Sequence, residues 1–222
     1  MVTLITGANG GLGRAVVQAF LESGATVFGA DLTWKPGAPE NPRFHAIEGN
    51  LAEQEECRRV VKEAGEVDAL VHLVGGFGGG KPIAESGDDV WAQMMNMNLS
   101  AALMMFRAVL PQMLDRKRGR IVAIGSRAAL EPIANFAAYN VSKAALVTLV
   151  KTLALELADS GITANVVLPS VIDTPANRAA MPDSDFSTWV KPESIANLLA
   201  WLVSDQASDI NGAAIPIYGR VR

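Results

Sequence analysis

The sequence predicts an α/β fold in which about seven parallel strands form one sheet covered by helices on both faces. Short runs rich in β-branched residues alternate with longer helical runs along the whole chain. A glycine-rich turn separates the first apolar run from the first helical run. Strands that alternate with helices form right-handed crossover units, so the strands lie parallel in one sheet.

The expected elements follow one another in a regular order. Strands are expected at 2–5, 26–30, 44–48, 67–74, 120–125, 162–168 and 213–217, and helices at about 12–21, 53–64, 88–114 with a kink, 138–158 and 192–203. The Pro- and Gly-rich stretch 34–42 is expected to be a loop. The polar stretch 173–190 is long enough to be a mobile lid over a site. No linker or repeat interrupts the chain, so residues 1–222 are expected to form a single doubly wound, Rossmann-like domain.

Composition narrows the classes of partner. Half of the 222 residues are hydrophobic and 19% are charged, which is typical of a globular protein. A formal net charge of -4 argues against nucleic acid as a partner. Cys57 is the only cysteine and cannot form an internal disulfide. With no secretory signal and no apolar run long enough for a bilayer, we expect a soluble cytoplasmic protein that does not bind membranes.

The glycine-rich turn is the first candidate binding site. It has the spacing T-G-x-x-x-G-x-G, with glycines at Gly7, Gly11 and Gly13. Glycines permit tight backbone angles and let a pyrophosphate approach the main chain, while the following helix start offers free N–H groups. The alternative is an ordinary glycine turn, but the strand–turn–helix context favours dinucleotide binding.

Asp31 follows the second expected strand. A carboxylate there accepts hydrogen bonds from both ribose hydroxyls of an adenosine and repels a 2′-phosphate. No Lys or Arg lies within residues 8–12 or immediately after Asp31 to offset that repulsion. The sequence therefore favours NAD(H) as the cofactor, with NADP(H) possible. The alternative is an aspartate that caps a turn.

Three further residues point to proton transfer. Tyr139 and Lys143 stand four apart at the start of a long helix and so share one face. A tyrosine pKa near ~10 is too high for proton exchange at neutral pH, but a Lys cation and a nicotinamide cation would lower it. Tyr139 is then a candidate general acid/base. Ser126 ends another expected strand, where a hydroxyl is able to bind a substrate oxygen or simply to cap a turn.

In their order and spacing, these residues resemble the short-chain dehydrogenase/reductase family along nearly the whole chain. Asn98, in the run Asn-Met-Asn-Leu, matches the family's catalytic-helix asparagine. The resemblance implies that Tyr139 exchanges the proton and that Lys143 binds the nicotinamide ribose. It also implies that Ser126 orients the substrate and that Asn98 supports a water relay. It implies cofactor contacts at Gly7, Asn9, Gly11, Leu12, Gly13, Asp31, Leu32, Asn50, Leu51, Val74, Gly75, Gly76, Tyr139, Lys143, Pro169, Val171, Ile172 and Thr174.

Some positions depart from the family pattern. Where the family has Asn-Asn-Ala-Gly, this chain has His72-Leu73-Val74-Gly75; Asn50 replaces a usual Asp, and Ser170 replaces a glycine. The stretches 67–79 and 168–189 resemble dihydropteridine reductases. Those enzymes typically keep the Tyr and Lys but lack the serine, so Ser126 keeps ketone and alcohol chemistry open.

Neither histidine predicts a metal site. His45 and His72 each lie in an apolar strand pattern, and no second ligand stands at a metal-like spacing, so we expect no bound metal.

The helical stretches 99–114 and 144–158 are apolar around most of their circumference. A monomer would expose part of that surface, so these helices are expected to pair in a homodimer or homotetramer.

The leading hypothesis is an NAD(P)-dependent oxidoreductase. It would transfer hydride between nicotinamide and a small-molecule carbonyl, alcohol or pteridine, with Tyr139 as general acid/base. Two alternatives remain: a dihydropteridine reductase specifically, and a non-catalytic NAD-binding redox sensor.

Overall fold

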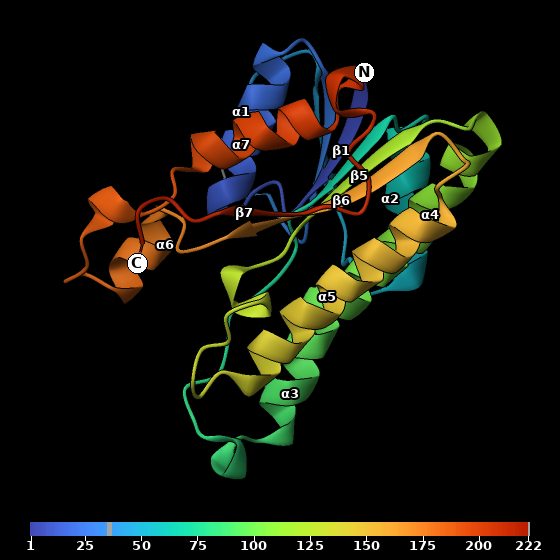
Figure 1. Ribbon diagram of the computed structural model, residues 1–222. Helices are drawn as coiled ribbons and strands as arrows, with labels where there is room; N and C mark the ends of the chain where they lie inside the picture. The colour runs from blue at the N-terminus through green and yellow to red at the C-terminus, as the bar shows by residue number, and fades with distance from the viewer. Residues whose placement is uncertain (35–36, 222) are drawn as a thin grey trace.

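Seven parallel strands form one sheet in the computed structural model, which describes residues 1–34 and 37–221. The strand order is β3-β2-β1-β4-β5-β6-β7 (Figure 1). The strands are β1 (Val2–Thr6), β2 (Thr26–Asp31), β3 (Phe44–Glu48), β4 (Ala69–His72), β5 (Gly119–Ile124), β6 (Ile162–Pro169) and β7 (Ala214–Ile217). The order reverses between β1 and β4, and a crevice opens at such a switch point beyond the carboxyl ends of the strands.

Helices cover both faces of the sheet. The helices α1 (Gly11–Glu22) and α7 (Pro192–Leu202) pack together on one face. The other face carries α2 (Gln54–Ala64), α4 (Ala101–Arg116) and α5 (Ala137–Glu156). Two shorter helices, α3 (Asp88–Met95) and α6 (Pro175–Ala180), lie beyond the carboxyl edge, where the N-terminal part of α5 also extends (Figure 1). The predicted α/β fold is therefore confirmed.

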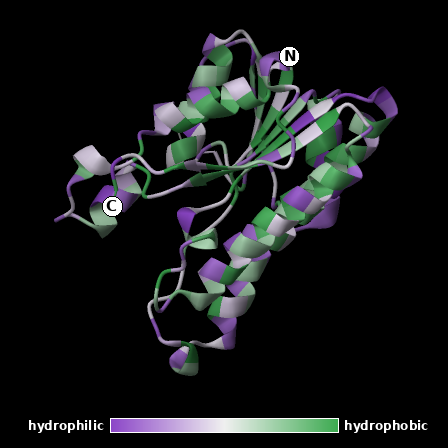
Figure 2. Cartoon of the chain, viewed as in Figure 1, coloured by the Kyte–Doolittle hydropathy of each residue, from purple (hydrophilic) through white to green (hydrophobic). Residues whose placement is uncertain are grey.

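Strand alternation divides the core into two layers. Leu4 and Leu70 belong to the cluster under α2, α4 and α5, whereas their neighbours Ile5 and Val71 belong to the cluster under α1 and α7. Successive side chains of a strand point to opposite faces, so continuous apolar runs are what a sheet covered on both sides requires. In Figure 2 the central strands are mostly green, the colour of hydrophobic residues.

The helix expected at 88–114 is interrupted. A π-helical turn, Asn96–Ser100, separates α3 from α4 within the stretch where a kink was expected without a stated position. Such turns are frequent at functional sites, and Asn98 lies within this one. The strand expected at 67–74 is limited to β4, because the chain turns away into the glycine-rich stretch after His72.

The stretch 173–190 contains structure that sequence patterning did not predict. It holds α6 and a 3₁₀ turn, Phe186–Thr188. Thr174 caps α6 by accepting a hydrogen bond from the N–H of Asn177. Two residues of the predicted loop 34–42, Lys35 and Pro36, lie outside the described residues, as does Arg222. No helix in the described part of the chain is long and apolar enough to cross a membrane.

Candidate active site

A pocket of about 400 Å³ lies at the switch point between β1 and β4. It is lined by Gly7, Gly10, Asp31, Leu32, Gly49, Asn50, Leu51, Ala52, Leu73, Val74, Gly75, Asn96, Met97 and Ala101. Seven residues of this set were predicted as cofactor contacts: Gly7, Asp31, Leu32, Asn50, Leu51, Val74 and Gly75. Sequence reasoning missed Met97, whose signal was its place in the same turn as Asn98.

The glycine turn has the shape that a dinucleotide cradle requires. Gly7 has φ of 70°, a left-handed conformation that glycine adopts without strain. A Cβ on Gly13 would clash with the main chain of Gly7 and Ala8. A Cβ on Gly11 would lie 3.1 Å from the side chain of Thr174, which brings the predicted nicotinamide-end segment against the turn. The residues present therefore fit a pyrophosphate beside the start of α1.

Asp31 is held against the glycine turn. Its Oδ2 accepts a hydrogen bond from the N–H of Asn9 at 2.8 Å, and its Oδ1 accepts one from Leu32 at 2.8 Å. Asn9 in turn donates from Nδ2 to the carbonyl of Thr33 at 2.9 Å. The carboxylate is thereby oriented at the rim of the pocket that it lines.

One cation near this carboxylate was missed by sequence reasoning. Arg14 donates from Nη2 to Oδ1 of Asn9 at 2.7 Å, and from Nη1 to the carbonyl of Gly37 at 3.3 Å. Its place in the first turn of α1 was the available signal, but only residues 8–12 were considered. The guanidinium therefore contacts Asn9, the residue whose N–H holds Asp31. The repulsion of a 2′-phosphate expected from the sequence did not take this positive charge into account.

Ser126 lies two residues after the end of β5. Its backbone is extended, and its Oγ accepts a hydrogen bond from the N–H of Ala128 at 3.1 Å as the cap of a short 3₁₀ turn. With an acceptor site of Oγ occupied in this way, the hydroxyl proton is free to donate. The Ser126 side chain also lowers the pKa of the Tyr139 phenol.

Burial has the larger effect on Tyr139. It raises the pKa of the phenol above the usual value of 10.0, and the contribution of Ser126 does not cancel it. The lowered pKa expected from the sequence needs both the Lys cation and a bound nicotinamide, and it stays a prediction. In the protein alone burial raises the pKa, because removal of the phenol from water disfavours its charged form.

Lys143 lies one turn after Tyr139 on α5 and is only 5% exposed. Its Nζ donates to the main-chain carbonyl of Ile124 at 3.0 Å. Burial lowers the pKa of this ammonium to about 8. The group therefore remains mostly charged at neutral pH, next to the end of β5 that leads to Ser126.

Asn98 connects three segments. Its Oδ1 accepts from the N–H of Gly76 at 2.8 Å, and its Nδ2 donates to the carbonyl of Gly76 at 3.1 Å and to Oγ of Ser142 at 3.0 Å. Ser142 itself donates to the carbonyl of Tyr139 at 2.8 Å. The Asn98 side chain thus ties the glycine-rich loop after β4 to the helix turn that carries Tyr139.

His72 takes part in packing the sheet. Its Nδ1 lies 2.9 Å from Oγ1 of Thr6 on the neighbouring strand, and its Nε2 is buried with no partner among the described residues. Burial, with a contribution from Lys143, lowers the pKa of His72 to about 3, so the ring stays neutral at physiological pH. No cluster of candidate metal ligands occurs in residues 1–34 and 37–221.

The stretch 173–190 folds back onto the end of the sheet. The N–H of Asp173 donates to the carbonyl of Val190 at 2.8 Å, and the N–H of Val190 donates to that of Val171 at 2.9 Å. Arg178 pairs with Asp173 and lies over the ring of Phe186 at 4.8 Å. Val171, Ile172 and Pro169, predicted as cofactor contacts, lie in and just before this arrangement, outside the pocket lining.

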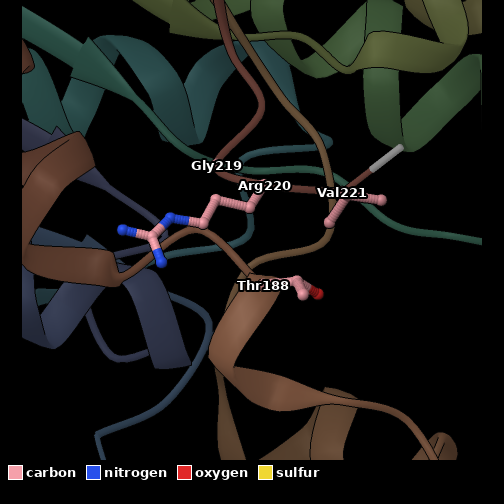
Figure 3. A pocket seen from close by; sticks show the side chains of 4 residues that line it. All are labelled: Thr188, Gly219, Arg220 and Val221. Carbon is pink, nitrogen blue, oxygen red and sulfur yellow. The ribbon is translucent and has the colours of Figure 1, made fainter.

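A second cavity of about 820 Å³ opens between this stretch and the C-terminal segment. It is lined by Thr188, Gly219, Arg220 and Val221, and Figure 3 shows the side chains of Arg220 and Val221 extending in opposite directions. The N–H of Arg220 donates to the carbonyl of Thr188 at 2.8 Å. Arg127, the neighbour of Ser126, donates to the carbonyl of Val221 at 3.3 Å, so this cavity adjoins the segment after β5.

Comparison with known proteins defines the family. The sequence-family model of the short chain dehydrogenases matches residues 1–185 of this chain. The chain is 32% identical over 246 residues to the short chain dehydrogenase adrF of Penicillium rubens, covering 98% of this chain and 95% of that protein. It is 32% identical over 235 residues to the 3-oxoacyl-(acyl-carrier-protein) reductase FabG of Salmonella typhimurium, covering 98% and 96%.

A solved structure agrees. The 3-ketoacyl-(acyl-carrier-protein) reductase from Brucella melitensis, complexed with NADH, superposes with a TM-score of 0.87 at 27% identity, covering 98% of this chain and 96% of that one. This chain belongs to the short-chain dehydrogenase family. It is an oxidoreductase of that family with an NAD(P)-binding fold.

Proposed function

We propose that this protein interconverts a small carbonyl compound and its alcohol, using NAD(P)(H), with Tyr139 as general acid/base. One observation carries the proposal. A buried ammonium, Lys143, lies one helical turn from the partly buried phenol of Tyr139, which also interacts with the side chain of Ser126. A cation, a proton donor and a hydroxyl in one water-poor region suit proton transfer to a carbonyl oxygen.

A nicotinamide held beside the glycine turn would supply the hydride for reduction and accept it for oxidation. Ser126 donates its free proton to the substrate oxygen and so fixes the carbonyl next to Tyr139. The raised pKa of Tyr139 keeps the phenol protonated at neutral pH, which suits it to donate a proton to the oxygen during reduction. The Lys143 ammonium then stabilises the resulting phenolate.

Asn98 has a positioning role in this proposal. Its side-chain hydrogen bonds go to Gly76 and Ser142 and fix the distance between the loop after β4 and Tyr139. The water relay expected at Asn98 stays a prediction. The stretch 173–190 is proposed as the lid, since it lies against the glycine turn at Thr174 and beside the second cavity.

NAD(H) is the proposed cofactor. The support is the carboxylate of Asp31, held at the pocket rim by Asn9 and Leu32 in a position to accept from ribose hydroxyls. Arg14 is close enough to Asn9 to offset part of the repulsion toward a 2′-phosphate, so NADP(H) is expected to be used less efficiently rather than excluded.

Dihydropteridine reduction is the second candidate. The observation that favours it is the resemblance of residues 67–79 and 168–189 to those enzymes. Ser126 favours the ketone reaction, because a quinonoid pteridine has less need of a carbonyl-binding hydroxyl. A non-catalytic NAD-binding redox sensor would have no need of Tyr139 one turn from the buried Lys143.

The test is an activity panel combined with Tyr139→Phe. NADH and NADPH are each supplied with a set of ketones and with quinonoid dihydropterin, and nicotinamide absorbance is followed. Ketone turnover is expected, with a loss of at least about 100-fold in Tyr139→Phe while NADH binding survives. Turnover of the pterin alone would favour the second candidate, and turnover of neither would favour the sensor.

We also propose a homodimer formed through the helical stretches 99–114 and 144–158. Much of their apolar surface is covered within the chain, since Leu146, Val150 and Leu153 are buried. Leu155 and Leu114 remain 79% and 45% exposed. The proposed contact would cover these two side chains.

A further inference from the structure

Phe77 is a large aromatic side chain that is exposed beside the proposed proton donor. It is 63% exposed, although it lies in the loop directly after β4. Its ring stacks on Phe136 with centroids 4.7 Å apart and planes 25° apart. It also meets the ring of Tyr139 edge to face, with centroids 4.8 Å apart at 76°. One face of Phe77 is thus supported while much of the ring remains open.

The loop that carries Phe77 is fixed in place. A Cβ on Gly79 would lie 2.6 Å from the ring of Phe136 and 3.0 Å from the carbonyl of Asn135, so only glycine permits this approach. The N–H of Gly80 donates to the same Asn135 carbonyl at 2.8 Å. On the other side, Asn98 holds the loop through both main-chain groups of Gly76. The glycine-rich stretch therefore serves to bring Phe77 close to α5.

The turn that supports Phe136 is fixed as well. Asn140 accepts a hydrogen bond from the N–H of Ile133 at 3.2 Å and donates to its carbonyl at 2.8 Å. Asn140 is the neighbour of Tyr139 on α5, so the stacked pair Phe77 and Phe136 and the proton donor Tyr139 are anchored to the same helical turn. Movement of Phe77 away from Tyr139 would break this packing.

Two exposed apolar side chains lie on the segment between Ser126 and Tyr139. Leu130 and Ile133, on the segment from Ser126 to Tyr139, are 55% and 46% exposed. The charges in that segment neutralise each other, because Arg127 pairs with Glu131 at 2.6 Å. A charged substrate group would find no unpaired charge among Arg127, Glu131 and their apolar neighbours Leu130 and Ile133.

We propose that Phe77 determines substrate specificity by stacking on a planar, unsaturated ring conjugated to the reacting carbonyl. The inference rests on the proposed ketone reduction and names its substrate class as aryl or conjugated cyclic ketones. A flat ring fits against the open part of Phe77, and offset stacking of two rings adds to the free energy of burying them. The carbonyl attached to that ring then lies at Ser126 and Tyr139.

Two ketones of equal carbon number provide the first test. Acetophenone carries a planar ring, and cyclohexyl methyl ketone carries the saturated ring of the same size. In Phe77→Leu, which keeps apolar volume and removes the ring, kcat/KM for acetophenone is expected to fall about tenfold, mostly through KM. The value for cyclohexyl methyl ketone should stay within about twofold, and Phe77→Tyr should retain the wild-type preference. Equal losses for both ketones, or no loss for either, would overturn the proposal.

A binding measurement separates this inference from the proposed function. Protein saturated with NAD⁺ cannot reduce a ketone, so acetophenone binding is measured directly by calorimetry for wild type and Phe77→Leu. Binding that weakens about tenfold in the variant supports the stacking site even if no ketone is turned over, in which case only the proposed reaction fails. Turnover with binding unaffected by Phe77→Leu, or no acetophenone binding to the wild type, removes the stacking site. Circular dichroism melting curves check that each variant folds.

Discussion

A methyl group added to Gly75 would lie 2.9 Å from Nζ of Lys143. The same methyl group would lie 2.8 Å from Oδ1 of Asn98. The loop after β4 thus approaches the buried ammonium so closely that no side chain fits between them. Glycine at this position is a requirement of the site and not only of the turn.

Gly75→Ala is therefore expected to displace Lys143 or Asn98 while the fold survives. Small displacements of catalytic groups are costly, so kcat should fall about 100-fold. The melting temperature should fall moderately, because both displaced side chains are buried and hydrogen-bonded within the chain. Gly78→Ala is the matched control, since its added Cβ would contact only the flexible side chain of Met94, and it should keep near-normal kcat. Equal activity of the two variants would contradict the expectation.

The lowered pKa of Lys143 predicts a pH-dependent stability. The folded protein releases this proton near pH 8, whereas the unfolded chain holds it up to about the usual value of 10.5. Between these values the unfolded state binds more protons, so this group makes the free energy of unfolding rise with pH, by about 3 kcal/mol in all. Below pH 8 its contribution is constant and unfavourable.

The measurement compares urea unfolding of cofactor-free wild type and Lys143→Met from pH 7 to pH 10. The difference between the two curves should show the rise. Burial raises the pKa of Cys57 to about 11, which acts in the opposite direction in both proteins and cancels. Parallel curves would mean that the pKa of Lys143 is not lowered.

Cofactor preference is expected to depend on Asp31 and Arg14 in opposite ways. Asp31→Ala removes the hydrogen-bond acceptor for the ribose hydroxyls and the charge that repels a 2′-phosphate. The kcat/KM for NADH should fall about tenfold and that for NADPH should rise. Arg14→Ala should lower the use of NADPH more than that of NADH.

Kinetics with each cofactor, at saturating ketone, check this prediction. The double variant indicates whether the two residues act independently, since both contact Asn9. An Asp31→Ala variant with unchanged preference would show that Asp31 serves only to order the glycine turn.

The proposed dimer is tested at Leu155. Leu155→Glu should convert the dimer to a monomer in sedimentation velocity at micromolar concentration, because it places a charge in an apolar contact. Ile83→Glu is the matched control, since Ile83 is also 79% exposed but lies outside both helical stretches. A wild-type protein that sediments as a monomer would refute the proposed interface.

Local sequence patterns were enough to predict the sheet, the helix order and the glycine turn. Apolar runs such as 162–168 correspond to β6, buried on both faces, and the T-G-x-x-x-G-x-G spacing corresponds to the strand–turn–helix at 2–22. These features depend on backbone preferences and on residues close together in the chain. The kink within 88–114 was also predicted, though not its π-helical form around Asn98.

Contacts between distant segments were decided only by the tertiary structure. The stacking of Phe77 on Phe136, the closeness of Gly75 to Lys143 and the use of the Asn98 side chain by Gly76 each join separate elements. The effect of burial on the pKa of Tyr139 was likewise decided by the tertiary structure, since desolvation depends on what covers the phenol. The residue types and their order along the chain determined the family and its scaffold. The packing of loops at the carboxyl edge of the sheet determined which side chains meet, because no local pattern encodes a contact between segments that are far apart in the chain.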